Sequence, residues 1–143
     1  MIVKHITHGV AIEWLSKQDV KGTWHEDFYE WKKHLLVSWP NVKKFYRGKN
    51  KWLGAFVDNK LRAIYWYTIV NKEMYDGFLI ADPSTPRIGI KLGRELYELT
   101  KNDWDVNWSM CDKKYIKFNE KLNYTVFDDM LIQEYKVYLL RRT

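Results

Sequence analysis

The spacing of hydrophobic and polar residues predicts strands and helices along most of the chain. Residues 2–7, IVKHIT, alternate as a half-buried strand does, and residues 10–17, VAIEWLSK, suit a short helix. Runs of β-branched and aromatic residues follow at 51–57 and 61–70. Three residues separate these runs, and Asn59 among them tolerates the left-handed conformation of a tight turn, so we predict a β-hairpin there.

The middle of the chain predicts a strand, a helix and another strand. Residues 74–82 and 105–111 have the composition of strands, and residues 91–100 have the spacing of a helix. One face of this helix carries Leu92, Leu96 and Leu99. Strand, helix and strand with a short return predict a parallel strand pair joined by a right-handed crossover.

Two further helices are predicted. Thr23 and Glu26 have the spacing of a capping box, and the helix that they begin ends before Pro40. Residues 113–122, KKYIKFNEKL, have the pattern of a last helix.

The chain ends in two predicted strands, residues 124–127 and 131–140, joined by a turn at Asp128 and Asp129. No repeat, low-complexity stretch or linker interrupts the pattern, so residues 1–143 are predicted to form one domain. This order of elements indicates an α+β fold with a mixed, mostly antiparallel sheet and about four helices.

Composition fits one core of ordinary size, since 46% of the 143 residues are hydrophobic. Aromatic residues make up 17%, and we expect most of them to fill the core and some to line a groove or an interface. The net charge of +6 and the pI near 9.3 favour acidic partners, which are nucleic acid, a nucleotide-like cofactor or an acidic protein surface.

The number and spacing of the cysteine and histidine residues exclude several kinds of site. Cys111 is the only cysteine, so an internal disulfide and a cysteine-rich zinc site are excluded, and we expect Cys111 to be buried. The four histidines lack metalloprotease spacing, so no metal is predicted. Neither a membrane-spanning run nor a signal peptide is evident, and we expect a cytoplasmic protein without membrane contact.

A basic segment, residues 31–52, contains seven lysines and arginines and no acidic residue, interleaved with aromatic rings. Such a surface suits single-stranded nucleic acid. It equally suits an acidic substrate, or a solvated loop that keeps the protein soluble. The candidate binding residues in it are Lys43, Lys44, Arg47 and Lys49.

The stretch from Pro83 to Thr100, PSTPRIGIKLGRELYELT, runs from the end of a predicted strand through a glycine-containing loop into a helix. Backbone N–H groups and a helix N-terminus at a strand end favour a ligand that carries phosphate.

The order of elements resembles that of the GCN5-related N-acetyltransferases (GNAT superfamily), and the resemblance covers nearly the whole chain. The family often carries a segment similar to FYEKLGF, and residues 118–124 here are FNEKLNY. The resemblance implies that the parallel strand pair splays apart and that acetyl-CoA lies in the gap. It implies an amine acceptor, either a small molecule or a protein.

The resemblance places the pyrophosphate of acetyl-CoA on the loop before the predicted helix at 91–100. The family's loop has glycine where Lys91 stands and glutamine or arginine where Ile88 stands, so this loop departs from the pattern. Lys91 either neutralises phosphate or is an ordinary solvated side chain. The implied cofactor contacts are Ile80, Arg87, Gly89, Lys91, Gly93 and Arg94.

The implied catalytic groups also depart from the family. Asn119 stands where many members have the tyrosine that protonates the leaving thiolate. Tyr115, one helical turn earlier, either replaces that acid or packs its ring. The general base of the family is often a carboxylate near the fourth strand, and Asp76 and Asp82 are candidates for that role or for surface and turn roles.

Two functions therefore stay open. The first is an acyl-CoA-dependent N-acetyltransferase. The second is a non-catalytic protein with the same fold, similar to small GNAT-like proteins of tailed phages, that binds nucleic acid or protein through the basic segment and acts in the host cytoplasm or in the virion. Fold alone does not choose between them.

Overall fold

The computed structural model describes residues 1–18, 51–132 and 135–143. The predicted helix between Thr23 and Pro40 lies outside the described residues, and so do the four candidate residues of the basic segment.

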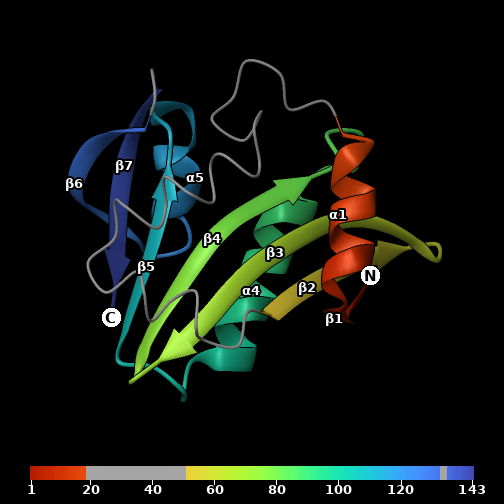
Figure 1. The fold of residues 1–143 in the computed structure, drawn as a ribbon, viewed down its shortest axis with the longest axis horizontal. Helices are drawn as coiled ribbons and strands as arrows, with labels where there is room; N and C mark the ends of the chain where they lie inside the picture. Colours follow the sequence, from red (N-terminus) through yellow and green to blue (C-terminus); the bar gives the residue numbers. More distant parts are fainter. Residues whose placement is uncertain (19–50, 133–134) are drawn as a thin grey trace.

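The described part of the chain contains a seven-stranded sheet with the order β1-β2-β3-β4-β5-β7-β6. All neighbouring strands pair antiparallel except β4 and β5, which are parallel (Figure 1). The mixed, mostly antiparallel α+β fold is therefore confirmed. The strands are β1 (Ile2–Ile6), β2 (Lys51–Val57), β3 (Lys60–Val70), β4 (Glu73–Ala81), β5 (Val106–Cys111), β6 (Thr125–Ile132) and β7 (Tyr135–Arg142).

Two tight turns join the long strands β2, β3 and β4. In each turn two consecutive residues have positive φ, at Asp58 (51°) and Asn59 (62°) in the first, and at Asn71 (51°) and Lys72 (65°) in the second. Two positive φ values fit the right-handed twist of a hairpin, and asparagine and aspartate tolerate them. The predicted hairpin is confirmed.

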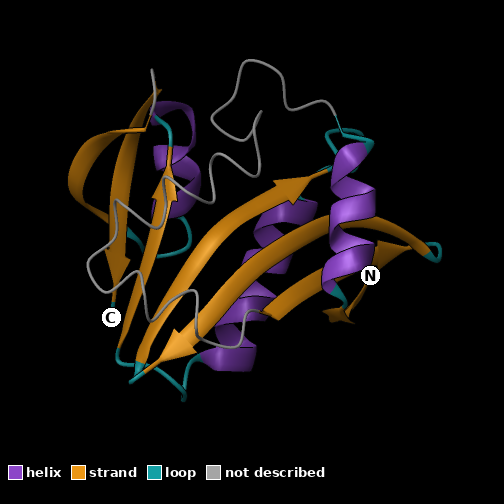
Figure 2. Cartoon of the chain, viewed as in Figure 1, coloured by secondary structure: helices purple, strands orange, loops and turns teal. Residues whose placement is uncertain are grey.

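Helices cover both faces of this sheet (Figure 2). Helix α1 (His8–Ser16) begins where the Thr7 hydroxyl accepts a hydrogen bond from the Val10 N–H. Helix α4 (Ile88–Thr100) lies on the opposite face, and the short helix α5 (Ile116–Glu120) follows a 3-10 turn, Lys113–Tyr115. Because successive side chains of a strand point to opposite faces of the sheet, the core has two parts. One part lies between α1 and the residues Trp52, Ile64 and Trp66. The other lies between α4 and the residues Leu53, Tyr65 and Tyr67.

Strands β4 and β5 pair over three positions only, which end at Tyr75 opposite Trp108. Beyond that pair β4 continues to Ala81 and β5 to Cys111, and the two strands diverge in Figure 1. We call this opening the split. The expected splayed parallel pair is thus present.

A bulge in β4 lies where the split begins. Trp66 on β3 pairs with Phe78, whereas the next residue, Tyr67, pairs with Asp76, so Gly77 has no partner on β3. A bulge bends its strand and turns backbone groups out of the ladder. The bulge therefore marks the point where β4 turns away from β5.

Three predicted details are wrong. Asp128 and Asp129 lie inside strand β6, paired with Leu139 and Tyr138, and not in a turn. Because β6 is an edge strand of the described sheet, its exposed face tolerates charge. The last helix is shorter than residues 113–122.

The third wrong detail is Leu99, which is 52% exposed. The buried face of α4 carries Ile88, Leu92, Leu96 and Thr100, which are four residues apart, so Leu99 falls outside this face. The Thr100 hydroxyl donates to the Leu96 carbonyl at 2.7 Å.

Candidate functional site

Helix α4 begins with a turn whose N–H groups receive no side-chain cap from the described part of the chain. Arg87 occupies the N-cap position with φ 61°, and its side chain makes no capping hydrogen bond. The first turn also contains no acidic residue. The unpaired donors and the helix dipole therefore offer a site for an anion. Two exposed basic residues, Arg87 and Lys91, add positive charge at this end of α4, and Arg94 is exposed at the middle of the helix.

Gly89 places that first turn at the mouth of the split. A Cβ atom added at Gly89 would lie 3.6 Å from both Ala81 Cβ and Phe118 Cζ. The turn therefore packs between the end of β4 and helix α5. The contacts are ordinary ones, so the site does not depend on the missing side chain of Gly89.

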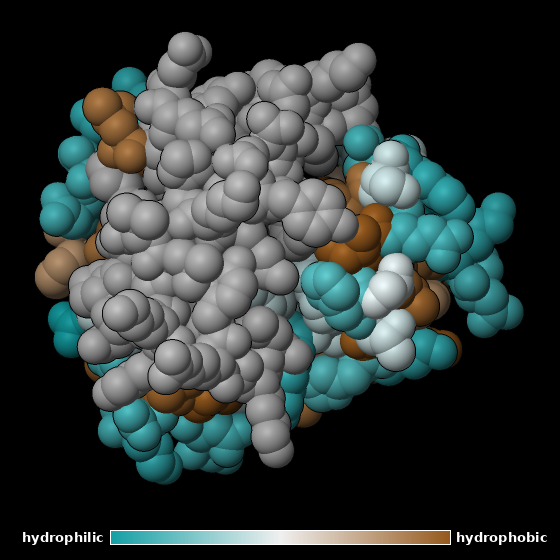
Figure 3. All heavy atoms as spheres, in the orientation of Figure 1, coloured by the Kyte–Doolittle hydropathy of each residue, from teal (hydrophilic) through white to brown (hydrophobic). Residues whose placement is uncertain are grey.

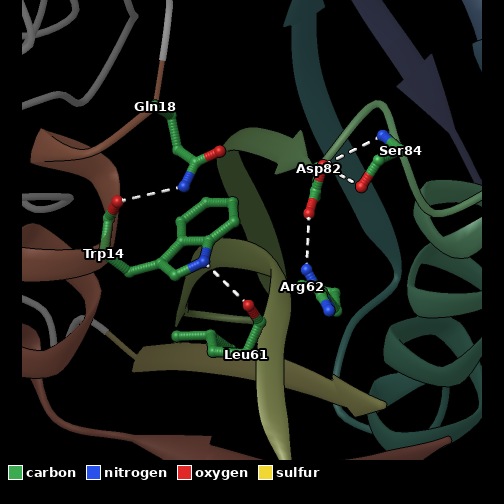
Figure 4. Close-up of polar contacts among 6 residues, drawn as sticks. All are labelled: Trp14, Gln18, Leu61, Arg62, Asp82 and Ser84. Atoms are coloured by element: carbon green, nitrogen blue, oxygen red, sulfur yellow. Dashed lines mark hydrogen bonds and ion pairs between the residues drawn. The ribbon is translucent and has the colours of Figure 1, made fainter. Parts of the chain in front are cut away.

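Asp82 organises the loop between β4 and α4 (Figure 4). Its Oδ1 accepts hydrogen bonds from the Ser84 N–H at 2.9 Å and from the Ser84 hydroxyl at 2.8 Å, while Oδ2 pairs with Arg62 Nη1 at 3.0 Å. The hydrogen bonds from Ser84 hold the pKa of Asp82 below its ordinary value, and Arg62 adds to this. The sequence left two kinds of role open for Asp82, as a general base or as a surface or turn residue. These contacts show that it is a turn residue.

The first unpaired positions of the split are polar and buried. Asp76 is 0% exposed, so the surface role left open for it is wrong. Its Oδ2 accepts a hydrogen bond from the Tyr65 hydroxyl at 2.6 Å and forms another with the Tyr124 hydroxyl. Burial raises the pKa of Asp76, although Arg142, the two tyrosine hydroxyls and Ser109 act in the opposite direction. Ile80, further along β4, is buried in the cluster on the α1 face.

Asn107 and Arg142 extend this polar cluster across β5 and β7. The Tyr124 hydroxyl lies 2.7 Å from Asn107 Oδ1, which also accepts from Arg142 Nε at 2.7 Å. Arg142 Nη1 donates to the Leu122 carbonyl at 2.8 Å, and its guanidinium lies 4.2 Å from the centre of the Tyr124 ring. We call Asp76, Tyr65, Tyr124, Asn107, Ser109 and Arg142 the buried polar cluster.

Sequence reasoning found only one member of the buried polar cluster, Asp76. A signal was available, because Asp76, Asn107 and Ser109 interrupt strands that are otherwise mostly apolar or aromatic. The other members, Tyr65, Tyr124 and Arg142, do not interrupt an apolar strand in this way and gave no signal in the sequence. Their meeting depends on the strand order.

Tyr115 lies beside the mouth of the split. It is 43% exposed, and its ring meets that of Phe118 edge-on, with 6.5 Å between the ring centres. Phe118 contacts the first turn of α4 at Gly89. Tyr115 is thus partly exposed, and its ring lies next to Phe118, which reaches the first turn of α4.

Asn119 and Cys111 are buried in the protein interior. Asn119 is 8% exposed and its Nδ2 donates to the Tyr115 carbonyl at 2.9 Å, so it serves the helix and offers no acid. Burial, assisted by Asp112, raises the pKa of Cys111 to about 12, and its thiol is therefore not a nucleophile.

Gly93 is buried, unlike the exposed predicted contacts Arg87, Lys91 and Arg94. It is buried in the second turn of α4, where an added Cβ atom would lie 2.7 Å from Leu122 Cδ1. Its small size serves close packing between α4 and the end of α5. A direct contact between Gly93 and a cofactor stays a prediction.

Asn123 explains one departure from the family segment. It stands where FYEKLGF has glycine, and its φ of 69° is the left-handed conformation that ends a helix. Asparagine supports this conformation better than other non-glycine residues. The substitution therefore preserves the turn from α5 into β6.

Metal-ligating clusters and membrane-spanning helices do not occur among residues 1–18, 51–132 and 135–143. No group of three His, Cys, Asp or Glu side chains there could hold a metal ion. None of the described helices is long and apolar enough to cross a bilayer. Large exposed hydrophobic side chains lie near α1 (Val10) and on the edge strand β6 (Phe127 and Leu131), and Figure 3 shows hydrophobic atoms among mostly hydrophilic ones.

Known proteins resemble this chain in structure but not detectably in sequence. No family sequence model matches the chain, and no curated protein sequence matches it. An acyl-CoA N-acyltransferase from Pseudomonas aeruginosa is 11% identical, with a TM-score of 0.64 over 100% of both chains.

Two further solved structures were determined with coenzyme A or acetyl-CoA. An aminoglycoside 6'-N-acetyltransferase complexed with coenzyme A is 12% identical, with a TM-score of 0.63 over 100% of this chain and 97% of the other. The N-acetyltransferase PseH from Campylobacter jejuni, in complex with acetyl coenzyme A, is 18% identical, with a TM-score of 0.62 over 99% of both chains. At these identities the likeness shows the fold, and the chain has the fold of the GCN5-related N-acetyltransferases.

Proposed function

We propose that this protein is an acyl-CoA-dependent N-acyltransferase that passes an acetyl group from acetyl-CoA to an amine. The observation that carries the proposal is the split between β4 and β5 together with the uncapped first turn of α4 at its mouth. Two of the structurally similar proteins were solved with coenzyme A or acetyl-CoA, which supports the same ligand here.

The described residues fit acetyl-CoA at three points. The first-turn N–H groups of α4, with Arg87 and Lys91 nearby, suit the pyrophosphate. From Asp76 to Ala81 strand β4 has no described partner on the β5 side, so its backbone groups can pair with the extended pantetheine arm. The bulge at Gly77 frees backbone groups from the β3 ladder at the start of the split, and an N–H group released there could polarise a thioester carbonyl.

Acetyl-CoA supplies an activated acyl group, so the protein has to position the two reactants and manage protons. The split holds the thioester beside the bulge, and an amine attacks its carbonyl directly. Tyr115, which is 43% exposed, is the candidate for returning a proton to the leaving thiolate. The free, buried Cys111 fits a reducing compartment, and we propose that the protein acts in the cytoplasm.

An assay of thiol release tests this proposal. Acetyl-CoA is mixed with the protein and with primary amines, both small molecules and lysine-containing peptides, and free CoA is measured with a thiol reagent. We expect release that depends on an amine, with acetylation of that amine seen by mass spectrometry. Release that is absent with every amine, in a protein that also fails to bind acetyl-CoA, would contradict the proposal.

A second candidate function rests on Asn119 and Lys91, which replace residues typical of the active family. In it the protein binds nucleic acid or protein through the basic segment. Charge reversal at Lys43, Lys44, Arg47 and Lys49 distinguishes the two. A binding protein would retard a single-stranded oligonucleotide in a salt-sensitive way and lose this in the variant. An enzyme that attracts an acidic acceptor would instead show a raised KM for that acceptor.

A further inference from the structure

The split begins with a pair of buried polar residues. Backbone pairing between β4 and β5 ends at Tyr75 and Trp108, and the next residues on the two strands are Asp76 and Ser109. Their exposed fractions are 0% and 5%. At this position buried polar side chains follow the last backbone pair of the two strands.

Asn107 has a fixed orientation in this cluster. Its Nδ2 donates to the Met74 carbonyl at 3.1 Å and to the Trp108 carbonyl at 3.3 Å, while its Oδ1 accepts from Arg142 Nε at 2.7 Å. Turning the amide over would place N–H against N–H and oxygen against two carbonyl oxygens. Asn107 Oδ1 is therefore only an acceptor toward Tyr124.

The hydrogen-bond contacts of the cluster need three protons. Tyr65 meets Asp76 Oδ2, Tyr124 meets the same oxygen, and Tyr124 also meets Asn107 Oδ1. Two of these oxygen pairs are at ordinary hydrogen-bond distance and the Tyr124–Asp76 pair is closer still, so each pair needs a proton between its two atoms. The two tyrosine hydroxyls supply two. The Tyr124 proton lies toward Asn107, because that amide oxygen has no proton of its own to offer.

We propose that Asp76 is a neutral carboxylic acid in the folded protein and donates the third proton to Tyr124. In this role it is the positioning residue that joins β4 to β5 at the base of the split. The chain of donors runs from Asp76 to Tyr124 to Asn107, and Tyr65 donates to Asp76 from β3.

The surroundings of Asp76 agree with a neutral acid. The groups that face it are Tyr65 on β3, Ser109 on β5, Tyr124 after α5 and Arg142 on β7. Only Arg142 is charged, and among the described residues no carboxylate lies within ion-pair distance of its guanidinium. Asn107 and the Tyr97, Trp104 and Tyr124 rings surround that guanidinium instead. Burial outweighs these groups and raises the pKa of Asp76.

Ionisation of Asp76 would remove the proton between Asp76 and Tyr124. Tyr124 would then have to turn its proton away from Asn107, which would lose one of the contacts that span β4, β5 and β7. Because this happens where the split begins, we expect loss of the proton to weaken binding of a ligand in the split. This last consequence rests on the proposed function, whereas the protonation state does not.

Carbon-13 NMR of the side-chain carboxyl groups tests the protonation state in the protein without ligand. Asp76→Asn identifies the resonance, and through-bond assignment in the parent replaces that step if the variant does not fold. We expect the Asp76 carbon to stay at the position of a protonated acid well above about pH 4, where exposed aspartates ionise. Titration at or below that pH, together with the other aspartates, would overturn the proposal.

Acetyl-CoA affinity measured against pH separates this role from the function of the site. We expect Kd to rise with pH as Asp76 ionises in the parent, and we expect the Kd of Asp76→Asn, which has no proton to lose at this position, to show no such rise over the same pH range. An equal rise in both proteins would overturn the positioning role. If neither protein binds acetyl-CoA at any pH, the proposed function fails, and the carboxyl titration still decides the protonation state.

Discussion

A Cβ atom added at Gly93 would lie 2.7 Å from Cδ1 of the buried Leu122, whereas one added at Gly89, a turn earlier in α4, would meet nothing closer than 3.6 Å. The two glycines of the same helix therefore differ in purpose. Gly93 allows α4 to approach the end of α5, and Gly89 does not need to be glycine for space.

Gly93→Ala should destabilise the protein by about 1–3 kcal/mol, because the extra methyl group overpacks a filled interior. Gly89→Ala is the matched control and should be neutral or stabilising by up to about 1 kcal/mol, since alanine favours a helix. Urea unfolding measures both free energies. Equal effects of the two changes would contradict the packing role of Gly93.

Arg87→Gly should raise stability and weaken acetyl-CoA binding at once. Arg87 has φ 61°, a conformation that costs a non-glycine residue about 1 kcal/mol and costs glycine almost nothing. Its charge stands at the first turn of α4, where the pyrophosphate is proposed to bind. The measurements are the unfolding free energy and the thermal shift with acetyl-CoA.

Lys72→Gly is the control for Arg87→Gly, because Lys72 is also an exposed basic residue with positive φ (65°) and lies in the turn at the opposite end of β4. It should gain similar stability and leave the acetyl-CoA shift unchanged. A loss of binding in both variants would point to net charge instead of a site at α4.

Tyr115→Phe should lower turnover roughly a hundredfold with acetyl-CoA affinity unchanged, as the loss of a general acid does. Tyr97→Phe, on the second half of α4, is the control and should keep turnover within a few-fold. Steady-state kinetics with any accepted amine measures both. Normal turnover in Tyr115→Phe would leave Tyr115 with only its ring contact to Phe118.

The stability contributed by Asp76 should fall as pH rises. Its pKa is raised by folding, so the folded state binds this proton more tightly than the unfolded chain. The contribution is therefore complete below about pH 4, the ordinary value for aspartate, and is lost as pH rises to the raised pKa. Within that window the loss is on the order of 1 kcal/mol per pH unit.

Urea unfolding of the parent and of Asp76→Asn across this pH range measures the effect. The difference in unfolding free energy between them should change with pH in the stated direction. A parent whose stability relative to the variant rises with pH would show that Asp76 folds as a carboxylate.

Local patterns were enough to predict the hairpin at Asn59, the parallel strand pair and the helix at residues 91–100 between its strands, although this helix begins three residues earlier, at Ile88. The turn at Asp128 and Asp129 was mispredicted because an edge strand accepts charged residues that would end a central strand. Leu99 was mispredicted because helical spacing alone does not say which neighbours reach the last turn.

The strand, loop and helix N-terminus where we propose that an anion binds could be predicted, because their order is visible in sequence. The buried polar cluster could not. Tyr65, Tyr124 and Arg142 come from three distant parts of the chain, and only the strand order brings them to Asp76. Tertiary pairing of this kind leaves no local periodicity.

Calorimetric titration of the purified protein with acetyl-CoA tests the central claim most directly. A fold that keeps its split open and the first turn of α4 uncapped should bind acetyl-CoA at one site per chain, and binding should weaken with Arg87→Gly and not with Lys72→Gly. Absence of binding at millimolar acetyl-CoA, in protein shown to be folded, would contradict the account.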